Sequence, residues 1–589
     1  MFGKTQSLVL TIVALACCGA LHAQYEKRWE SIACHSWRVS SADDFSAVPD
    51  DADSLVIEGR DDAVYDLSRF KNLQQLIVQS HLINPNGDSR LRNLPSTLVG
   101  FRIACGDIKF AALMTLLKNS PHLNVLEISC WGAFDVKSKL RLDYFGDLTT
   151  FTFITFGRAD SEIRHSPWDS LIDLPAVDDW LRPLANLSKL TKVVLDMPRL
   201  PLPATLRIAT LPTLKSFAST QVTDDALAGF VEMESPIEEL NLAGNKLVTD
   251  YGMEFLPRLK NLRRLCVAGC INVGDFGIPH IAAIPHLEEL DISAQVWEYE
   301  YPPTPTYPLN HLSTRGDDRN FRLQFPEYLS QLGDIKTLKV LTAHNVSTFT
   351  SKILSDVVMA LPSLETLDIS GCVGQIGKKI GNASNNGALS DASHLEFLHT
   401  HKSLKKIVLA ATLGDIPRPS PLTSAALASL AESQTVEAID ISGAEGIAAD
   451  SIAALSKAKQ LRTLNMGRVV VKGDLGAALL SLTQLESVSV SEYKNNLDIP
   501  ELLAARNYVS LELRVLTLRD DVLRALANST IQHLSIVSYK PAEEAKFVEL
   551  AESLKSLKVF QIRNGDSTER VSLRNKITAV RKELDLAIE

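Results

Sequence analysis

Three segments in the middle of the chain carry one apolar pattern: IEELNLAG at 237–244, LRRLCVAG at 262–269 and LEELDISA at 287–294. Successive copies begin 25 residues apart. In an extended chain alternate side chains face the same side, so Leu240 and Leu242 are expected to point inward and Asn241 outward. A turn and about a dozen residues with helical spacing follow each segment. The pattern predicts a stack of units, each made of one strand, one turn and one helix.

The same pattern recurs on both sides of these copies. On the N-terminal side it begins at Leu73, Leu98, Leu123 and Leu148, again 25 residues apart. With less regular spacing, further copies are placed at Leu190, Leu214, Leu338, Leu364, Leu404, Val436, Leu461, Leu485, Leu513, Ile531 and Leu557. Because each unit of such a stack adds its own core, the array accounts for a chain of 589 residues. Strands are narrower than helices, so we expect a parallel sheet on a concave face and helices on a convex face.

The segment LRRLCVAGCINVGDFG at 262–277 resembles the leucine-rich-repeat family. Cys270 lies at the position that this family fills with Cys or Asn, and V-x-D-x-G leads into the helix. The segments QVTDDAL at 221–227, LVTDYGM at 247–253 and LDISGCVG at 367–374 are similar. Within the family, the chain resembles the cysteine-containing and ribonuclease-inhibitor-like types, as found in bacterial repeat proteins. The resemblance implies an α/β horseshoe solenoid over residues 51–565 and leaves the biochemical role open.

The two ends of the chain differ from the repeats. Residues 1–23 have the form of a secretory signal, with Lys4, an apolar run and a cleavage site after Ala23. We therefore expect a secreted or periplasmic protein, the alternative being a lipid attached to Cys18. No later stretch has the length of an integral membrane span. Residues 24–50, with Trp29 and Trp37, are expected to form an N-terminal cap, and residues 566–589 a C-terminal capping helix. Insertions are expected near 296–330 and 373–400.

The net charge bears on which partners the protein can bind, and the cysteines bear on whether it contains a disulfide. The net charge of −10 is spread without long runs of one sign and would repel a phosphate backbone, so no nucleic-acid partner is expected. Cys105 and Cys130 lie at equivalent places in adjacent units. A disulfide between them is one prediction, and two buried thiols that act as small apolar residues are the other.

The sequence contains no recognised motif for catalysis or metal binding. The segment GCVGQIGKK at 371–379 has the wrong glycine spacing for a phosphate loop, and Lys379 lies where Ser or Thr would bind magnesium. His394, His399 and His401 lie near Glu396, but their spacing matches no standard set of metal ligands. We therefore expect no enzyme, no cofactor and no metal.

Two surfaces are candidate ligand-binding sites. The first is the row of outward positions between the last two apolar residues of each unit. From this row, which also includes Cys266 and Ser489, the predicted ligand-binding residues are Asn241, Asp291, Thr342, Asp368, Asp440 and Asn465. Such a polar, somewhat acidic row fits a cationic or hydroxyl-rich ligand, and solvated strand positions are the alternative interpretation.

The second surface is the insertion VWEYEYPPTPTYP at 296–308. Its predicted ligand-binding residues are Trp297, Tyr299, Tyr301 and Tyr307. Aromatic rings offer a large contact area and prolines favour an extended chain. A degenerate repeat whose aromatic side chains pack on their own neighbours is the alternative.

Taken together, these features predict an exported, non-enzymatic binding protein that recognises a protein or a glycan through its concave face. A receptor-like or adhesion module is the first alternative, and a hydrolase with an unrecognised site is the second.

Overall fold

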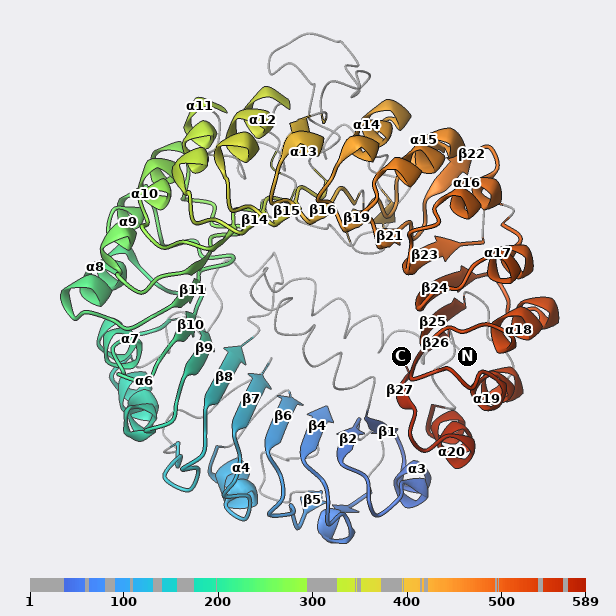
Figure 1. The fold of residues 1–589 in the computed structure, drawn as a ribbon. Coiled ribbons are helices and arrows are strands. Elements are labelled where there is room, and N and C mark those ends of the chain that lie inside the picture. Colours follow the sequence, from blue (N-terminus) through green and yellow to red (C-terminus); the bar gives the residue numbers. More distant parts are fainter. Residues whose placement is uncertain are drawn as a thin grey trace, which may run out of the picture. The chain divides into compact units, whose positions relative to one another are not determined.

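In the computed structural model, the described residues are 36–588 without 59–62, 80–89, 106–109, 131–139, 156–173, 198, 294–325, 345, 347–350, 372–394, 396, 411, 414–415, 418–421, 493–494, 496, 539–543 and 565–569. The expected signal at 1–23 and the aromatic insertion at 296–308 lie outside the described residues. The chain forms two compact units, Met1–Leu287 with Gln295–Arg322, and Glu288–Ala294 with Leu323–Glu589. In each unit the strands lie along the inner side of an arc and the helices along its outer side (Figure 1). The predicted α/β leucine-rich-repeat solenoid is therefore confirmed.

The first unit alternates parallel strands with short helices. Its main-sheet strands are β1 (Trp37–Val39), β2 (Ser54–Ile57), β4 (Gln75–Gln79), β6 (Gly100–Cys105), β7 (Val125–Cys130), β8 (Thr150–Thr155), β9 (Lys192–Asp196), β10 (Ser216–Ala218), β11 (Glu239–Asn241) and β12 (Arg264–Cys266). Its helices are α3 (Ala42–Ala47), η1 (Leu67–Arg69), α4 (Phe110–Leu117), α6 (Leu174–Leu181), η2 (Arg182–Asn186), α7 (Leu202–Ala209), α8 (Asp224–Glu232), α9 (Asp250–Met253), η3 (Leu256–Arg258), η4 (Asp275–Gly277) and α10 (Ile278–Ala282). A small parallel pair, β3 (Tyr65–Asp66) and β5 (Leu91–Arg92), lies outside the main sheet.

The second unit has the same construction. Its main-sheet strands are β13 (Glu289–Asp291), β14 (Val340–Thr342), β15 (Thr366–Asp368), β16 (Lys406–Val408), β19 (Ala438–Asp440), β21 (Thr463–Asn465), β23 (Ser487–Ser491), β24 (Ser510–Val515), β25 (His533–Ser538), β26 (Val559–Asn564) and β27 (Asp585–Ile588). Its helices are α11 (Pro326–Leu329), η6 (Ser330–Asp334), α12 (Ser351–Ala360), α13 (Phe397–Thr400), α14 (Ser424–Ser429), η8 (Leu430–Glu432), α15 (Ala449–Ala454), η9 (Leu455–Lys457), α16 (Leu475–Ser481), α17 (Ile499–Ala505), α18 (Asp520–Ala527), α19 (Glu544–Ser553) and α20 (Arg570–Val580). Two small pairs, β17 (Thr412–Leu413) with β18 (Ile416–Pro417) and β20 (Glu445–Ala448) with β22 (Val470–Lys472), complete it.

Strand register places the predicted apolar positions side by side in the core. Leu240 pairs with Leu265 in the first unit, and both are buried. In the second unit one buried ladder runs through Leu290, Leu341, Leu367, Ile407, Ile439, Leu464, Val488, Leu511, Leu534, Phe560 and Leu586. The repeat start placed at Leu513 is wrong, because Leu513 lies inside β24. Tyr508, which is 1% exposed, precedes that strand where the other units have their first Leu.

The V-T-D turns form a ladder of hydrogen bonds between adjacent repeats. The Thr223 and Thr249 hydroxyls cap helices α8 and α9 by accepting hydrogen bonds from the Ala226 and Tyr251 N–H groups, at 3.2 Å in each case. The Asp224 carboxylate accepts from the N–H and the hydroxyl of Thr249, at 2.9 and 2.7 Å, so it reaches the turn of the next repeat. Asp250 repeats the contact one unit later, accepting from the Gly274 N–H at 2.5 Å. The aspartate of this motif thus joins one repeat to the next.

The Asn or Cys position after the strand also links neighbouring repeats. The Cys270 thiol is buried and donates to the Leu242 carbonyl at 3.0 Å, in the preceding repeat. Asn245, 25 residues earlier, is fully buried and donates to the Val222 carbonyl at 2.9 Å. Asn495 donates in the same way to the Val469 carbonyl at 2.7 Å. A short polar side chain at this position therefore satisfies a backbone carbonyl beside the core.

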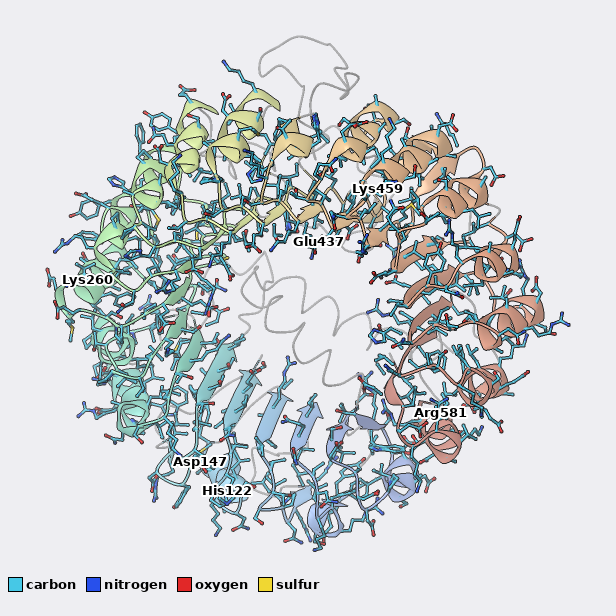
Figure 2. The ribbon with its side chains drawn as sticks, in the orientation of Figure 1. His122, Asp147, Lys260, Glu437, Lys459 and Arg581 are labelled. Carbon is cyan, nitrogen blue, oxygen red and sulfur yellow. The ribbon has the colours of Figure 1, made fainter. Side chains whose placement is uncertain are left out.

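Both ends of the described chain continue the sheet. In the region expected to cap the N-terminus, Trp37 of β1 is 8% exposed and lies in register with Leu55. Within residues 566–589, where a capping helix is expected, α20 is followed by β27, which pairs with β26. Arg581 (labelled in Figure 2) donates to the carbonyls of Ala551 and Leu554, both at 3.2 Å, and of Leu557 at 2.8 Å. This guanidinium satisfies carbonyls at the end of α19 and so holds α20 against it.

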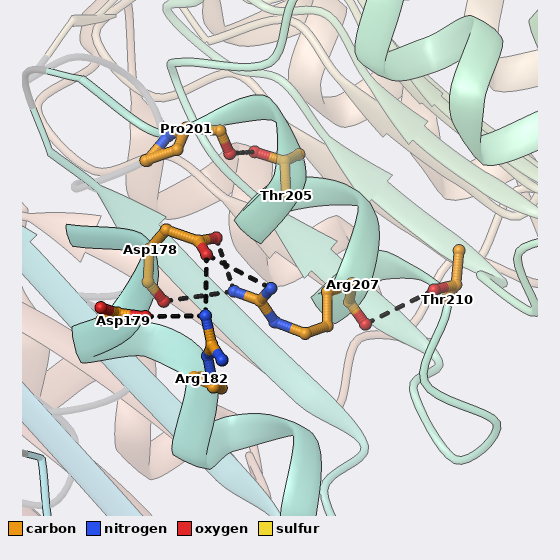
Figure 3. A network of polar contacts seen from close by, with 7 residues as sticks. All are labelled: Asp178, Asp179, Arg182, Pro201, Thr205, Arg207 and Thr210. Carbon is orange, nitrogen blue, oxygen red and sulfur yellow. Dashed lines mark hydrogen bonds and ion pairs between the residues drawn. The ribbon is translucent and has the colours of Figure 1, made fainter. Parts of the chain in front are cut away.

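Helices of adjacent repeats are also joined on the convex side of the first unit. Arg207 of α7 donates to the Asp178 carboxylate of α6 at 2.6 Å and to the Asp178 carbonyl at 3.2 Å (Figure 3). Arg182 of η2 pairs with Asp179 at 2.7 Å. Asp178 is half-buried, so its pair with Arg207 is the better shielded of the two contacts.

Candidate functional site

The structure brings most of the predicted concave residues into one lateral row of the second unit. Asp291 pairs in register with Thr342, and Thr342 with Asp368. After Val408, which interrupts the polar row, Asp440 pairs with Asn465. All five predicted residues of this row are half-buried. Asn241 belongs to the first unit and is 3% exposed, so its side chain presents little surface to a ligand.

The acidic and amide side chains of this row hydrogen-bond to their own backbone. The Oδ1 atoms of Asp291, Asp368, Asp440 and Asn465 each accept from the N–H two residues later, at 2.9, 3.1, 2.8 and 3.1 Å respectively. Asn241 makes the same contact with the Ala243 N–H at 2.9 Å. This is the Asx turn, in which a side-chain oxygen replaces a backbone acceptor as the strand ends. The row therefore has a structural role that periodicity alone did not reveal.

Several of the remaining polar atoms are paired across strands. The Asn465 amide donates to Asp440 Oδ2 at 2.8 Å. His344 Nε2 lies 2.9 Å from Asp368 Oδ2. Burial alone would raise the pKa of Asp368, but the hydrogen bonds from His344 and Ser370 hold it below its ordinary value. These contacts leave less free carboxylate on this face than the sequence indicates, which weakens the case for a cationic ligand.

A hollow of mixed polar and apolar lining, which includes Leu464, Val488, Leu511 and Leu534, lies further along the same face, over β21 to β26. Its volume is about 300 Å³, near the lower end of the range for small-molecule sites. Two rows of outward-pointing side chains line it. The first row consists of Thr463, Ser487, Ser510, His533 and Val559, and the second of Asn465, Ser489, Glu512, Ser535 and Gln561. Asn465 is therefore the predicted binding residue that lines the β21–β26 hollow.

The β21–β26 hollow contains a hydrogen-bonding group without a partner, as do Thr152, Ser216 and Tyr508 elsewhere among the described residues. Among the described residues, the side-chain hydroxyl of Ser489 has no hydrogen-bond partner although the residue is only 7% exposed. Glu512 Oε1 accepts from Arg514, at 2.9 Å from Nε and 2.7 Å from Nη2. Elsewhere in this unit serine hydroxyls commonly bond to nearby carbonyls, as Ser481 does to the Ala478 carbonyl at 2.6 Å. The hollow thus combines a locally neutral charge with hydroxyl groups that the fold does not use.

The concave face of the first unit has a different character. A buried apolar cluster there consists of Ile154, Val194, Ala218, Ala243, Cys266 and Ala268. Arg102 and Glu127 are adjacent in register and are 9% and 3% exposed. Burial lowers the pKa of Arg102 to about 10, and the nearby Glu127 carboxylate opposes that shift. Because this face is so buried, the second unit offers the better candidate binding surface.

The other predicted sites have separate outcomes. Trp297, Tyr299, Tyr301 and Tyr307 lie outside the described residues, so the insertion surface stays a prediction. Cys105 and Cys130 are register partners on β6 and β7, as expected, and their disulfide also stays a prediction.

The histidine cluster noted in the sequence contains a structural residue. His401 is 5% exposed; its Nε2 lies 2.9 Å from the Leu361 carbonyl, and its Nδ1 accepts from the Leu404 N–H at 3.1 Å. Among the described residues, no group of three or more His, Cys, Asp or Glu side chains is placed to hold a metal ion. None of the described helices combines the length and apolar character needed to cross a membrane.

Comparison with known proteins gives matches to solved structures. No family model matches the chain, and no curated protein matches it. A structure of a TLR13–ssRNA13 complex matches with 13% sequence identity and a TM-score of 0.36, over 86% of this chain and 70% of that chain. An internalin (inlF) from Listeria monocytogenes matches with 13% identity and a TM-score of 0.26, over 72% of this chain and 82% of that chain. At these values neither match bears on the ligand.

Proposed function

We propose that this protein is a non-enzymatic recognition module that binds a protein or a glycan through the concave face of its second unit. The observation that carries this proposal is the β21–β26 hollow, where polar side chains of neighbouring strands converge on a volume of about 300 Å³. A rigid sheet holds these side chains in register, so a ligand would meet a preorganised surface. A receptor-like or adhesion module would use the same surface, and it differs by being attached to a cell.

Export is the second part of the proposal. It rests on the N-terminal sequence, with Lys4 before an apolar run and small residues up to Ala23. Expression of the full chain followed by N-terminal sequencing of the exported product tests it. A mature chain beginning at Gln24 is the expected result, and retention of the intact N-terminus inside the cell would contradict export.

Filling the hollow tests whether it is the binding surface. The variant Ser487→Arg with Ser535→Arg places two long side chains in it, and Glu552→Arg on the exposed side of α19 is the control. Wild type and both variants are immobilised and exposed to the native extracellular or periplasmic fraction. A ligand retained by wild type and the control but lost by the double variant supports recognition at the hollow. Equal retention by all three proteins would place the binding site elsewhere.

A second measurement separates binding from hydrolysis. A binder loses affinity gradually as several lining residues change, because each contributes a small part of the contact. A hydrolase loses turnover by orders of magnitude when one catalytic carboxylate, such as Glu512, is replaced. Product analysis of the retained ligand after incubation with wild type and Glu512→Gln distinguishes the two.

A further inference from the structure

We propose that the β21–β26 hollow binds a neutral oligosaccharide. This inference rests on the proposed function, because it names the ligand class of the same surface. It is drawn from the charge balance of the hollow, from the number of uncommitted hydroxyl groups and from the buried hydroxyl of Ser489.

Charge balance favours a neutral ligand. Glu512 is the carboxylate in the lining, and Arg514 lies 2.7 Å from it, so the two charges offset each other. A strongly anionic or cationic ligand would lose hydration in the hollow without gaining a free counter-charge, which is unfavourable. A neutral polar ligand has no such penalty.

The hydroxyl groups of the lining match a ligand that carries hydroxyls of its own. The side chains of Thr463, Ser487, Ser510 and Ser535 are half-buried. Each hydroxyl can donate one hydrogen bond and accept others. Neighbouring strands lie about 4.8 Å apart, so these groups form a ladder rather than one isolated contact. An oligosaccharide presents hydroxyls along its length and can therefore hydrogen-bond to the hydroxyl groups of several neighbouring strands at once.

Ser489 adds a polar group that the fold leaves unsatisfied. It lies between Asn465 and Glu512 in its row, it is 7% exposed, and its hydroxyl has no partner among the described residues. A buried hydroxyl without a partner costs free energy, so such groups are uncommon unless something else uses them. The Ser489 Oγ atom is covered in the free protein, so a ligand hydroxyl would satisfy it once a neighbouring side chain moves aside.

The test is calorimetric titration of the full chain with defined hexasaccharides. The neutral probes are maltohexaose, cellohexaose, xylohexaose, mannohexaose and hexa-N-acetylchitohexaose, and the charged probes are hexagalacturonate and a heparin hexasaccharide. Binding of at least one neutral probe, with weaker or no binding of the charged probes, is expected. Absence of binding by every neutral probe, or preference for a charged one, would overturn the proposal.

Substitutions locate the binding in the hollow. Ser489→Ala and Ser535→Ala should each weaken binding of the neutral probe by about three- to tenfold, the effect of one lost hydrogen bond. Thr366→Val, on the same face at β15 and outside the hollow, is the matched control and should leave affinity unchanged. Ser489→Ala should also leave the thermal midpoint unchanged or raised, because the free protein loses an unsatisfied hydroxyl. Unchanged affinity in both serine variants would refute the assignment.

The two proposals can fail independently. If the Ser487→Arg with Ser535→Arg variant loses a captured protein ligand while no neutral hexasaccharide binds wild type, recognition at the hollow stands and the ligand class is wrong. If a neutral hexasaccharide binds wild type and the filled variant equally, the hollow itself is wrong.

Discussion

The substitution Gly252→Ala tests the hydrogen-bond ladder between repeats. A Cβ atom at Gly252 would lie 2.2 Å from Asp224 Oδ1 and 3.1 Å from both Asp224 Cγ and Leu227 Cδ1. The first distance is too short to persist, so the Asp224 carboxylate must move away from Thr249 or the helices must separate. Glycine occurs at this position because it leaves room for the aspartate of the preceding repeat.

The expected loss of stability follows from the hydrogen bonds that the movement of Asp224 breaks. Asp224 accepts two hydrogen bonds from Thr249, and hydrogen bonds to a charged group contribute about 1.5–3 kcal/mol each. Part of the loss is offset, because alanine is favoured over glycine in a helix by about 1 kcal/mol. If both bonds are lost, we therefore expect Gly252→Ala to lower the free energy of unfolding by about 2–5 kcal/mol.

A double-mutant cycle separates the clash from other effects. In an Asp224→Ala background the carboxylate is absent, so Gly252→Ala should cost nothing or stabilise by up to about 1 kcal/mol, and the coupling energy should be about 3–6 kcal/mol. Urea denaturation followed by circular dichroism gives the free energies, and hydrogen exchange of α8 and α9 shows whether the loss is local, since repeat arrays need not unfold in one step. Gly146→Ala is the control, because its Cβ would meet nothing within 4 Å. Additivity of the two substitutions within about 0.5 kcal/mol would refute the explanation.

Three further predictions concern other parts of the second unit. The pKa of Asp368 is held below its ordinary value, so its carboxylate stabilises the fold above about pH 4 and this stability is lost as the pH falls through the folded-state pKa. Asp368→Asn should flatten the acid decline of the urea midpoint below about pH 4, and an unchanged decline would contradict this. His401→Ala removes the hydrogen-bond partner of the Leu361 carbonyl and of the Leu404 N–H. We expect it to lower the free energy of unfolding, measured by urea denaturation, by about 2–4 kcal/mol. A smaller loss would contradict the structural role of His401. Tyr508→Phe removes a buried hydroxyl without a partner among the described residues, so its thermal midpoint should be unchanged or higher; a clear decrease would show that the hydroxyl is bonded.

The sequence is informative about the core because burial follows chain periodicity. Leu240 and Leu242 are predicted to face inward, and both are fully buried. The same reasoning misplaced the repeat near 513, because β24 alternates Leu511, Leu513 and Val515 and so offers the apolar pattern more than once. Tyr508 lies where the other repeats have their first leucine, and an aromatic residue does not match the leucine pattern.

The candidate site was less predictable for a different physical reason. Periodicity indicates the face to which Asp440 or Asn465 points, but it does not show that their oxygens bond to the backbone two residues later. The lining of the β21–β26 hollow includes small hydroxyl residues such as Ser487, Ser510 and Ser535, which also occur on ordinary solvated strands. Their significance appears only when the register places them side by side and their bonding is known.

The Asx turns on the concave face have a consequence for how the protein can diverge over evolutionary time. Asp440 and Asn465 bond to the backbone and to each other, so replacing either one disturbs the end of a strand. Ser487, Ser510 and Ser535 occupy the same face within the hollow, and no side-chain hydrogen bond to the described residues ties them to the fold. Selection can therefore alter ligand preference at these serines while the aspartate and asparagine preserve the surface that displays them. Related chains would be expected to differ first at the serines.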